Sequence, residues 1–354
     1  MTENTKGDGR MELQQALDTF MPLIEQELRA CMPSPEGGND AFIGMMHYHM
    51  GWSDEHFLPT TARTGKRLRP FLTLLACQAA GGSPQTALPA AAAVEIIHNF
   101  SLVHDDIEDR SPTRRGRRTV WSLWGDAQAI NTGDAMFVLA HLALQRLSRY
   151  GIPDHCVVSA LRILDETCLA LCRGQYLDLA FESTLEVDAD AYMAMITGKT
   201  AALLGCAMQL GALVALGEIA PTERYRSVGE KLGLAFQIQD DILGIWGEPE
   251  VTGKPVADDL RSRKKTLPVI YVLSKAEDTR ATRLRHLYSQ ERLSEADVAE
   301  AMRILDACGA RTYAEQLATG YLHETLAEIE ALDAEPQATE VLRELALSLV
   351  QRAH

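Results

Sequence analysis

The stretch LVHDDIEDR, residues 102–110, ends an apolar helical pattern that runs from Ala87 to Asp109. Apolar residues in this pattern recur three and four positions apart, which places them on one face of a helix. Alternation with the period of a strand is almost absent. We therefore predict an all-α protein with ten or more helices. The other helical patterns cover residues 11–31, 68–80, 132–150, 155–182, 189–216, 222–246, 265–276 and 294–332.

Several short signals divide these patterns. PSPEGGND, residues 33–40, predicts a loop, and Ser294 with Asp297 resembles a capping box before an apolar helix. Cys308-Gly309 predicts that this helix stops there. The β-branched run at residues 269–273 lies inside a helical pattern and is too isolated to found a sheet. No linker or fixed-period repeat divides the chain, so we expect one domain over residues 11–354 after a disordered terminus at residues 1–10.

Composition narrows the class of protein. The 354 residues include 34 Lys and Arg against 49 Asp and Glu, a formal charge of -15, which disfavours a nucleic-acid partner. A hydrophobic share of 46% is typical of a globular chain that folds around a core. The seven cysteines are odd in number and contain no Cys-x-x-Cys, and the N-terminus has no signal-peptide core. We expect reduced thiols and a cytoplasmic location.

Residues 200–220 are the most membrane-like segment of the chain. They include Gln209, Glu218 and three glycines, and they follow Lys199. This pattern favours a buried helix over a transmembrane segment.

The carboxylates of the opening stretch carry the densest chemistry. An acidic run after an apolar helix is ordinarily a solvated cap. Here Asp105 and Asp109 lie one turn apart on the same face, so their repulsion costs free energy unless a positive charge lies between them. Mg²⁺, bound by one or two carboxylates together with water and phosphate oxygens, would supply that charge.

A second acidic pair ends another apolar helix. FQIQDDILG, residues 236–244, carries Asp240 and Asp241, with Gln237 one turn earlier on the same side. Two helices that end in acidic pairs suggest a multi-metal clamp on a polyphosphate.

Basic residues accompany these acids along the chain. RRGRR alone is typical of a solvated loop or a nucleic-acid patch, and the acidic composition disfavours the patch. Arginine forks and lysine charges suit a diphosphate, whose charge exceeds what Mg²⁺ alone neutralises. The basic elements are GKRLRP at residues 65–70, RRGRR at residues 114–118, Lys199, Lys254 and Lys264.

These motifs together resemble the trans-isoprenyl diphosphate synthases, the all-α prenyltransferase family of farnesyl and geranylgeranyl diphosphate synthases. The resemblance runs from about Gly65 to Tyr271. The matching elements, in order, are GKRLRP, His98, DDIED at residues 105–109, RRG at residues 114–116, Gly174-Gln175-x-x-Asp178, Lys199-Thr200, FQIQDD, Gly253-Lys254-Pro255, and Asp259-Leu260 leading to Lys264-x-Thr266.

The resemblance implies a single bundle of helices around a central cavity, the isoprenoid synthase fold, and a homodimer. The implied reaction ionises an allylic diphosphate, joins the carbocation to isopentenyl diphosphate and releases a proton. Three Mg²⁺ ions per active site and the protein's cations would stabilise the leaving charge in a cavity poor in water.

Site roles follow from the same resemblance, position by position. The metal ligands would be Asp105, Asp109 and Asp240, supported by Asp106 and Asp241. The allylic diphosphate would be held by Arg114, Lys199 and Lys254, and isopentenyl diphosphate by Lys66, Arg69, His98 and Arg115. Oxygen dipoles near the carbocation would come from Thr200 and Gln237, and Lys264 would help to close the polar lid.

Two positions depart from the family pattern. Gly244 stands where the second motif usually ends in Asp, and Ala257 stands where Gly is usual. Loss of one carboxylate could weaken Mg²⁺ binding, leave a water in its place or signal altered chemistry. Glu248 could substitute for the missing carboxylate if its helix continues past Gly247.

Two other functions stay open on the same scaffold. A terpene cyclase would ionise a prenyl diphosphate without a second substrate, and it would not need the basic set assigned to isopentenyl diphosphate. A non-catalytic subunit of a heteromeric synthase would be expected to lose acidic motifs. The chain keeps that basic set and both motifs, which favours elongation.

Product length is predicted from the helix before Asp105. At about 100° per residue, Ser101, Ile97 and Phe100 fall on the side away from His98, where they can line a tail pocket. Phe100 is five residues before Asp105, where a large residue tends to limit growth in this family, and the first motif lacks a two-residue insertion. Geranylgeranyl diphosphate (C20) is the expected product, with farnesyl diphosphate (C15) next. The alternative is that Phe100 is only a core residue.

Three histidines and a tryptophan, His47, His49, Trp52 and His56, lie before the first basic motif. A metal cluster would need further ligands, and no carboxylate stands at ligand spacing. We expect a surface helix and loop.

Overall fold

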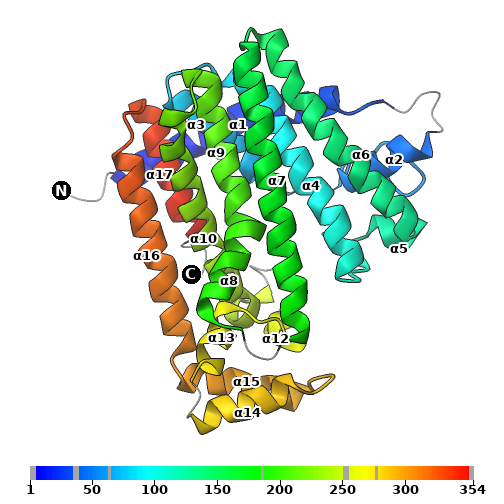
Figure 1. Cartoon of the computed structure of the whole chain (residues 1–354), viewed down its shortest axis with the longest axis vertical. Coiled ribbons are helices and arrows are strands. Elements are labelled where there is room, and N and C mark those ends of the chain that lie inside the picture. The colour runs from blue at the N-terminus through cyan, green and yellow to red at the C-terminus, as the bar shows by residue number, and fades with distance from the viewer. Residues whose placement is uncertain are drawn as a thin grey trace. The chain divides into compact units, whose positions relative to one another are not determined.

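The computed structural model describes residues 5–34, 40–62, 65–184, 187–249, 255–275 and 278–350 (Figure 1). Within these ranges the secondary structure is helical except for one two-stranded ribbon, β1 (Thr113–Arg114) with β2 (Arg117–Arg118), and one isolated bridge. The predicted all-α class is confirmed.

The helices follow one another with short connections. In order they are α1 (Thr5–Cys31), α2 (Ala41–His49), α3 (Leu68–Ala79), η2 (Pro84–Ala87), α4 (Leu88–Glu108), α5 (Val120–Trp124), α6 (Asp126–Gln145), η3 (Arg146–Tyr150), α7 (Asp154–Ser183), α8 (Ala189–Ile196), η4 (Thr197–Ala201), α9 (Ala202–Leu216), η5 (Ala220–Thr222), α10 (Glu223–Trp246), α12 (Asp258–Arg261), α13 (Leu267–Leu273), α14 (Thr279–Tyr288), α15 (Glu295–Ala307), α16 (Ala310–Glu330) and α17 (Pro336–Val350).

Most predicted helices are present, and the local signals hold. Ser294 and Asp297 form the predicted capping box, and Gly309, with a φ of 72°, separates α15 from α16. The β-branched run lies within α13. Helix α6 begins at Asp126 rather than at residue 132, and α1 begins at Thr5 rather than at residue 11. No helical pattern predicted α5, α12, α14 or α17, and α2 was expected only as part of a surface helix and loop around residues 47–56.

The chain divides into two compact units. The first contains residues 1–165, 206–226 and 333–341, and the second contains residues 166–205, 227–332 and 342–354. Helices α7 and α17 each contribute to both units. The single domain over residues 11–354 stays a prediction.

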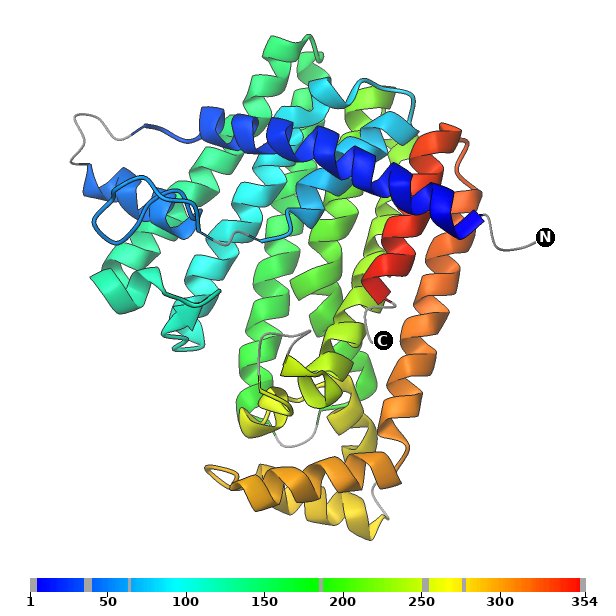
Figure 2. The ribbon, with the colours of Figure 1, turned by 180° about the vertical axis from the view of Figure 1, so that it is seen from behind.

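In the first unit, α4 packs along α6 and also contacts α3 and α1 (Figures 1 and 2). Figure 2 shows α1 crossing this layer. The contact faces are apolar and fully buried, as Val94, Ile96 and Ile97 of α4 and Met136 of α6 illustrate. This packing holds the acidic end of α4 in place.

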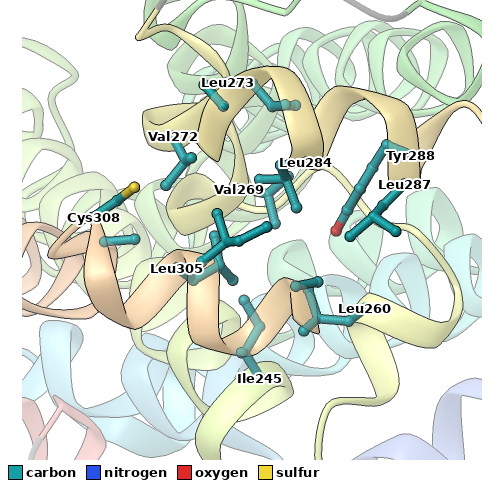
Figure 3. Packing of buried hydrophobic residues seen from close by; sticks show 14 of the residues in the cluster. Ile245, Leu260, Val269, Val272, Leu273, Leu284, Leu287, Tyr288, Leu305 and Cys308 are labelled. Carbon is teal, nitrogen blue, oxygen red and sulfur yellow. The ribbon is translucent and has the colours of Figure 1, made fainter. Parts of the chain in front are cut away.

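In the second unit, α14 and α15 pack together at the end of α16 (Figure 1). A cluster of buried side chains joins Ile245 of α10 to Leu260 of α12, Val269 of α13, Leu284 of α14 and Leu305 of α15 (Figure 3). The cluster therefore anchors the acidic end of α10 and the α12 segment to the same core.

Within the part of the chain that the structure describes, two helical stretches are long and apolar enough to span a membrane by composition, Pro84–Glu108 and Ala189–Leu216. Their most apolar windows are 72% and 83% buried inside the protein. Such burial is typical of core helices in a globular protein.

A pair of helical glycines tests the close packing of the first unit. A Cβ on Gly211 of α9 would overlap the carbonyl oxygen of Thr73 in α3, whereas a Cβ on Gly320 of α16 would meet no atom within 4 Å. We expect Gly211→Ala to lower the free energy of unfolding by about 1–3 kcal/mol. Gly320→Ala should raise it by about 0.5–1 kcal/mol, because alanine favours a helix.

Urea denaturation followed by circular dichroism measures both changes. Equal effects of the two substitutions would contradict the packing of α9 against α3.

Candidate active site

At the acidic end of α4, one carboxylate is buried in the protein and others face outward. Asp106 is buried and accepts a hydrogen bond from Arg114 Nε at 2.8 Å. Asp105 is partly exposed and pairs with Arg114 Nη2 at 3.1 Å, and Asp109 caps the helix in an exposed position. Burial raises the pKa of Asp106 to about 6, and the charge of Arg114 opposes that rise. Asp105 and Asp109 thus remain the outward carboxylates of this end.

Arg114 and Arg115 lie on the β1–β2 ribbon. Arg115 and Gly116 form its two-residue turn with φ values of 54° and 78°, the positive pair that a type I′ hairpin requires. Arg117 anchors the ribbon, because its guanidinium donates to the carbonyl oxygens of Tyr48 (3.1 Å) and Ser53 (2.7 Å) and lies 3.9 Å from the centre of the Tyr48 ring. Residues 48–53 therefore set the position of both predicted ligands.

The GKRLRP motif is anchored by its middle arginine, for which the motif suggested no role. Arg67 has a φ of 50° and is buried, and its Nη1 donates to Glu95 Oε1 of α4 at 2.7 Å. The two side chains are only 6% and 2% exposed. Asn99 also donates to Glu95, at 2.9 Å. This buried ion pair ties the segment that carries Lys66 and Arg69 to α4.

Several predicted ligands of isopentenyl diphosphate influence one another electrostatically. Burial lowers the pKa of His98 well below its usual value, and the charges of Arg69, Arg115 and Arg114 lower it further. Burial also lowers the pKa of Arg115. Arg69, His98 and Arg115 therefore belong to one basic neighbourhood of the first unit.

The segment at residues 47–56 differs from its prediction. His56 is exposed, as expected of a surface loop, but Trp52 is buried and His49 Nε2 is enclosed. Burial lowers the pKa of His49 to about 3, with the arginines 115, 114 and 67 acting in the same direction. The surface interpretation is wrong for His49 and Trp52, because the segment folds back onto the arginine ribbon.

In the second unit, the acidic pair near the end of α10 likewise has one outward and one buried side chain. Asp240 is exposed, whereas Asp241 is buried. The Asp241 carboxylate accepts hydrogen bonds from Tyr192 Oη (2.5 Å), the Leu267 amide (2.9 Å) and Gln237 Nε2 (3.1 Å). Burial nevertheless raises its pKa to about 7. Asp241 thus ties α8, α10 and α13 together and leaves Asp240 outward.

Lys199 and Thr200 lie on η4, a single π-helical turn between α8 and α9. Such turns are frequent at functional sites. A Cβ on Gly174 of α7 would overlap the Lys199 backbone, and Lys199 Nζ lies 2.5 Å from Asp178 Oδ2. The close approach explains Gly174 of the Gly174-Gln175-x-x-Asp178 motif, and the ion pair explains Asp178. Thr200 donates to Gln237 Oε1 at 2.7 Å.

The two departures from the family pattern have structural counterparts. Helix α10 ends at Trp246, so the condition under which Glu248 would substitute on a continued helix is not met. Instead, the Asp259 carboxylate occupies the space beside Gly244, where a Cβ would overlap it. Ala257 is buried with a φ of 61°, a left-handed conformation that glycine adopts at lower cost. The sequence offered no signal that Asp259 would lie there.

The two remaining predicted lysines are Lys254 and Lys264. Lys254 lies outside the described residues. Lys264 has an exposed side chain, while its neighbour Lys265 donates from Nζ to the carbonyl oxygen of Phe181.

The predicted product-length residues lie on α4 against α6. The Phe100 ring makes edge contacts with His104 and Phe137, with ring centres 5.6 and 5.4 Å apart. Ile97 is fully buried, and Ser101 donates to the His98 carbonyl oxygen at 2.8 Å. Phe137 was missed, because α6 was predicted without reference to its partner helix.

The carboxylates fit an Mg²⁺ ion that takes only some of its ligands from the protein and the others from water and phosphate oxygens. Among the described residues no three His, Cys, Asp or Glu side chains converge as a metal site. Each helix end offers one or two outward carboxylates, which is the usual protein share of an Mg²⁺ shell completed by water and phosphate oxygens.

Outward carboxylates next to basic side chains suit an enzyme that binds diphosphate esters. Comparison with known proteins supports such a function. A sequence model of the polyprenyl synthetase family matches residues 52–305. The chain belongs to this family, the trans-isoprenyl diphosphate synthases, and it is a short-chain trans-prenyltransferase.

Individual relatives are similar over most of their length. The chain is 41% identical over 311 residues to a (2E,6E)-farnesyl diphosphate synthase of Mycobacterium tuberculosis, which covers 87% of this chain and 85% of that protein. It is also 41% identical over 318 residues to a geranylgeranyl diphosphate synthase of the same species, covering 88% and 89%. A polyprenyl synthetase structure from Streptomyces coelicolor superimposes with a TM-score of 0.87 at 33% identity and covers 96% of this chain and 99% of that one.

The Arg67–Glu95 pair makes a testable contribution to stability. We expect Glu95→Gln to lower the free energy of unfolding by about 3 kcal/mol, because Arg67 would keep a buried charge with only the more distant and more exposed Glu25, at 3.7 Å, as its counter-ion. Glu315→Gln, which removes the exposed partner of Arg311, is the matched control and should cost about 0.5 kcal/mol at most. Chemical denaturation measures both, and similar losses would show that the buried pair has no special weight.

Proposed function

We propose that this enzyme condenses isopentenyl diphosphate with an allylic diphosphate in a reaction that requires Mg²⁺. One observation supports this function over cyclisation. The first unit carries a further basic set, Arg69, His98 and Arg115, in addition to the Arg114-linked carboxylates of α4. A cyclase handles one diphosphate and does not need this further set.

Each set of residues has its own task. Asp105, Asp109 and Asp240 would hold the three Mg²⁺ ions, which stabilise the charge of the departing diphosphate when bound. Arg114 orients Asp105 and Asp106, and Lys199, held by Asp178, presents its charge to the allylic diphosphate together with Lys254.

The remaining assignments follow the family pattern. Lys66, Arg69, His98 and Arg115 bind isopentenyl diphosphate, and the linked Thr200 and Gln237 place oxygen atoms near the carbocation. Asp241 holds α10 in place, and Lys264 contributes to the closing segment.

We further propose geranylgeranyl diphosphate as the product, with farnesyl diphosphate next. Phe100 and Phe137 form an aromatic contact on adjoining helices, two turns of α4 or less from Asp105. Relatives at similar identity include farnesyl, geranylgeranyl and geranylfarnesyl diphosphate synthases, so overall similarity does not select among these lengths. The aromatic contact is what favours an intermediate length.

The proposed enzyme is a cytoplasmic homodimer. Ile130, Val138 and Leu142 of α6 are 46%, 55% and 49% exposed. Val138 and Leu142 are one turn apart on the same face, and Ile130 lies about two turns before Val138. A second copy of the chain would cover this apolar face. All seven cysteines are free thiols, as expected in a reducing compartment.

The metal assignment predicts a severe loss of turnover in Asp105→Asn and Asp240→Asn. We expect at least a hundredfold loss, since about 3 kcal/mol of leaving-group stabilisation corresponds to that factor. Initial rates with Mg²⁺, isopentenyl diphosphate and dimethylallyl, geranyl or farnesyl diphosphate measure it. Glu108→Gln, an exposed neighbour on α4 outside the proposed ligand set, is the matched control and should keep near-normal turnover.

The same assay distinguishes the alternatives. Near-normal turnover of both Asp variants would refute the metal assignment. A cyclic hydrocarbon formed without consumption of isopentenyl diphosphate would identify a cyclase, and absence of any product from the wild-type protein alone would favour a non-catalytic subunit.

The length assignment predicts that Phe100→Ala yields longer products at a similar turnover, because it removes a bulky ring beside the proposed tail pocket. Chromatography of the dephosphorylated alcohols measures the distribution. Phe42→Ala, an exposed aromatic residue on α2, is the control and should leave the distribution unchanged. An unchanged distribution in Phe100→Ala would mean that this residue is only part of the core.

A further inference from the structure

His49 lies at the end of α2 and lines a pocket beside the arginine ribbon. The pocket is also lined by Arg114, Arg115, Arg117, Arg118 and Asp106. Its wall is built by the segment after His49, because Tyr48 and Ser53 accept the hydrogen bonds of Arg117. Residue 49 is therefore held in a firm position next to the predicted diphosphate ligands.

The Nε2 atom of the His49 ring makes no hydrogen bond of ordinary length in this pocket. It is buried and unsatisfied among the described residues, and the neighbouring Asn99 side chain, whose Oδ1 is unsatisfied too, interacts with the ring without closing such a bond. A buried polar atom without a partner costs about 1–3 kcal/mol. Such an atom, in a pocket lined by cations, indicates a place for a ligand atom that accepts a hydrogen bond.

The charges around His49 specify the kind of ligand. Most neighbouring cations already have partners, since Arg67 pairs with Glu95, Arg114 with Asp105 and Asp106, and Arg117 with backbone carbonyls. Arg115 makes no ion pair with any described carboxylate. The local excess of positive charge therefore lies at Arg115, next to His49 and His98.

A neutral imidazole suits this position. The low pKa of His49 keeps the ring uncharged, so it adds a directed N–H without adding to the repulsion among the arginines. In the Nε2–H tautomer this group donates, and a phosphate oxygen is the matching acceptor.

We propose that His49 is a further binding residue for isopentenyl diphosphate and donates from Nε2 to a phosphate oxygen of the diphosphate that Arg115 holds. This proposal rests on the proposed condensation reaction. Both Arg114 and Arg115 act electrostatically on His49 and His98. The proposal assigns His49 to isopentenyl diphosphate rather than to the allylic substrate, because Arg114 on the allylic side is already bonded to two carboxylates, whereas Arg115 makes no ion pair with a described carboxylate.

Binding and kinetics of His49 variants test the proposal. Titration calorimetry with isopentenyl diphosphate in Mg²⁺-free buffer reports the basic pocket without the metal-dependent substrate. We expect His49→Phe to weaken this binding by about tenfold to a hundredfold, as loss of a hydrogen bond to a charged group does. The KM for isopentenyl diphosphate should rise by a similar factor, while the KM for the allylic substrate should change less than about twofold.

Two further variants separate a lost contact from a disturbed fold. The amide nitrogen of glutamine can reach the place of Nε2, so His49→Gln should keep most of the affinity, whereas the shorter His49→Asn should not. His56→Ala, an exposed histidine seven residues later, is the matched control and should bind as the wild type does. Thermal denaturation of each variant monitors folding.

Three results would overturn the proposal. Wild-type affinity in His49→Phe would show that no contact is lost, and equal affinity of the Gln and Asn variants would exclude a directed donor. A parallel rise of both KM values would show that His49 acts through the arginine ribbon. Failure of the wild type to bind or consume isopentenyl diphosphate would instead refute the proposed function itself.

Discussion

The cost of burying a carboxylate is the constraint on which both acidic helix ends depend. Adjacent residues on a helix are about 100° apart, and in both Asp-Asp pairs this separation turns one side chain toward the core and the other outward. In each pair the second residue, Asp106 or Asp241, is the buried one. Each then needs hydrogen-bond donors from outside its own helix turn, because an unpartnered buried charge is strongly unfavourable.

The donors that meet this need also set the architecture of each unit. Asp106 is met by Arg114, which fixes the ribbon to α4, and Asp241 is met by Tyr192 and the Leu267 amide, which fix α8 and α13 to α10. The outward carboxylates Asp105 and Asp240 gain defined positions as a consequence. The buried member of each pair thus acts as a structural anchor for the member that is available to a metal.

The need of a buried charged group for a partner also applies to the basic residues. Arg67 is buried and is matched by Glu95, and Arg117 is matched by two backbone carbonyls, so both are structural. Arg115 differs, because it makes no ion pair with a described carboxylate and its charge acts on His49 and His98. Partner chemistry, rather than position within an arginine-rich motif, therefore separates Arg67 and Arg117 from Arg115.

The sequence by itself determined the helical class, most helix positions, the capping box and the acidic and basic motifs, because periodicity, caps and motif spacing are local properties of the chain. It missed α5, α12, α14 and α17. Only the tertiary structure showed that His49 is enclosed, that Arg67 needs Glu95, and that Asp259 fills the space beside Gly244. These facts depend on contacts between residues that are 15 to 66 positions apart, and no local pattern encodes such a distance.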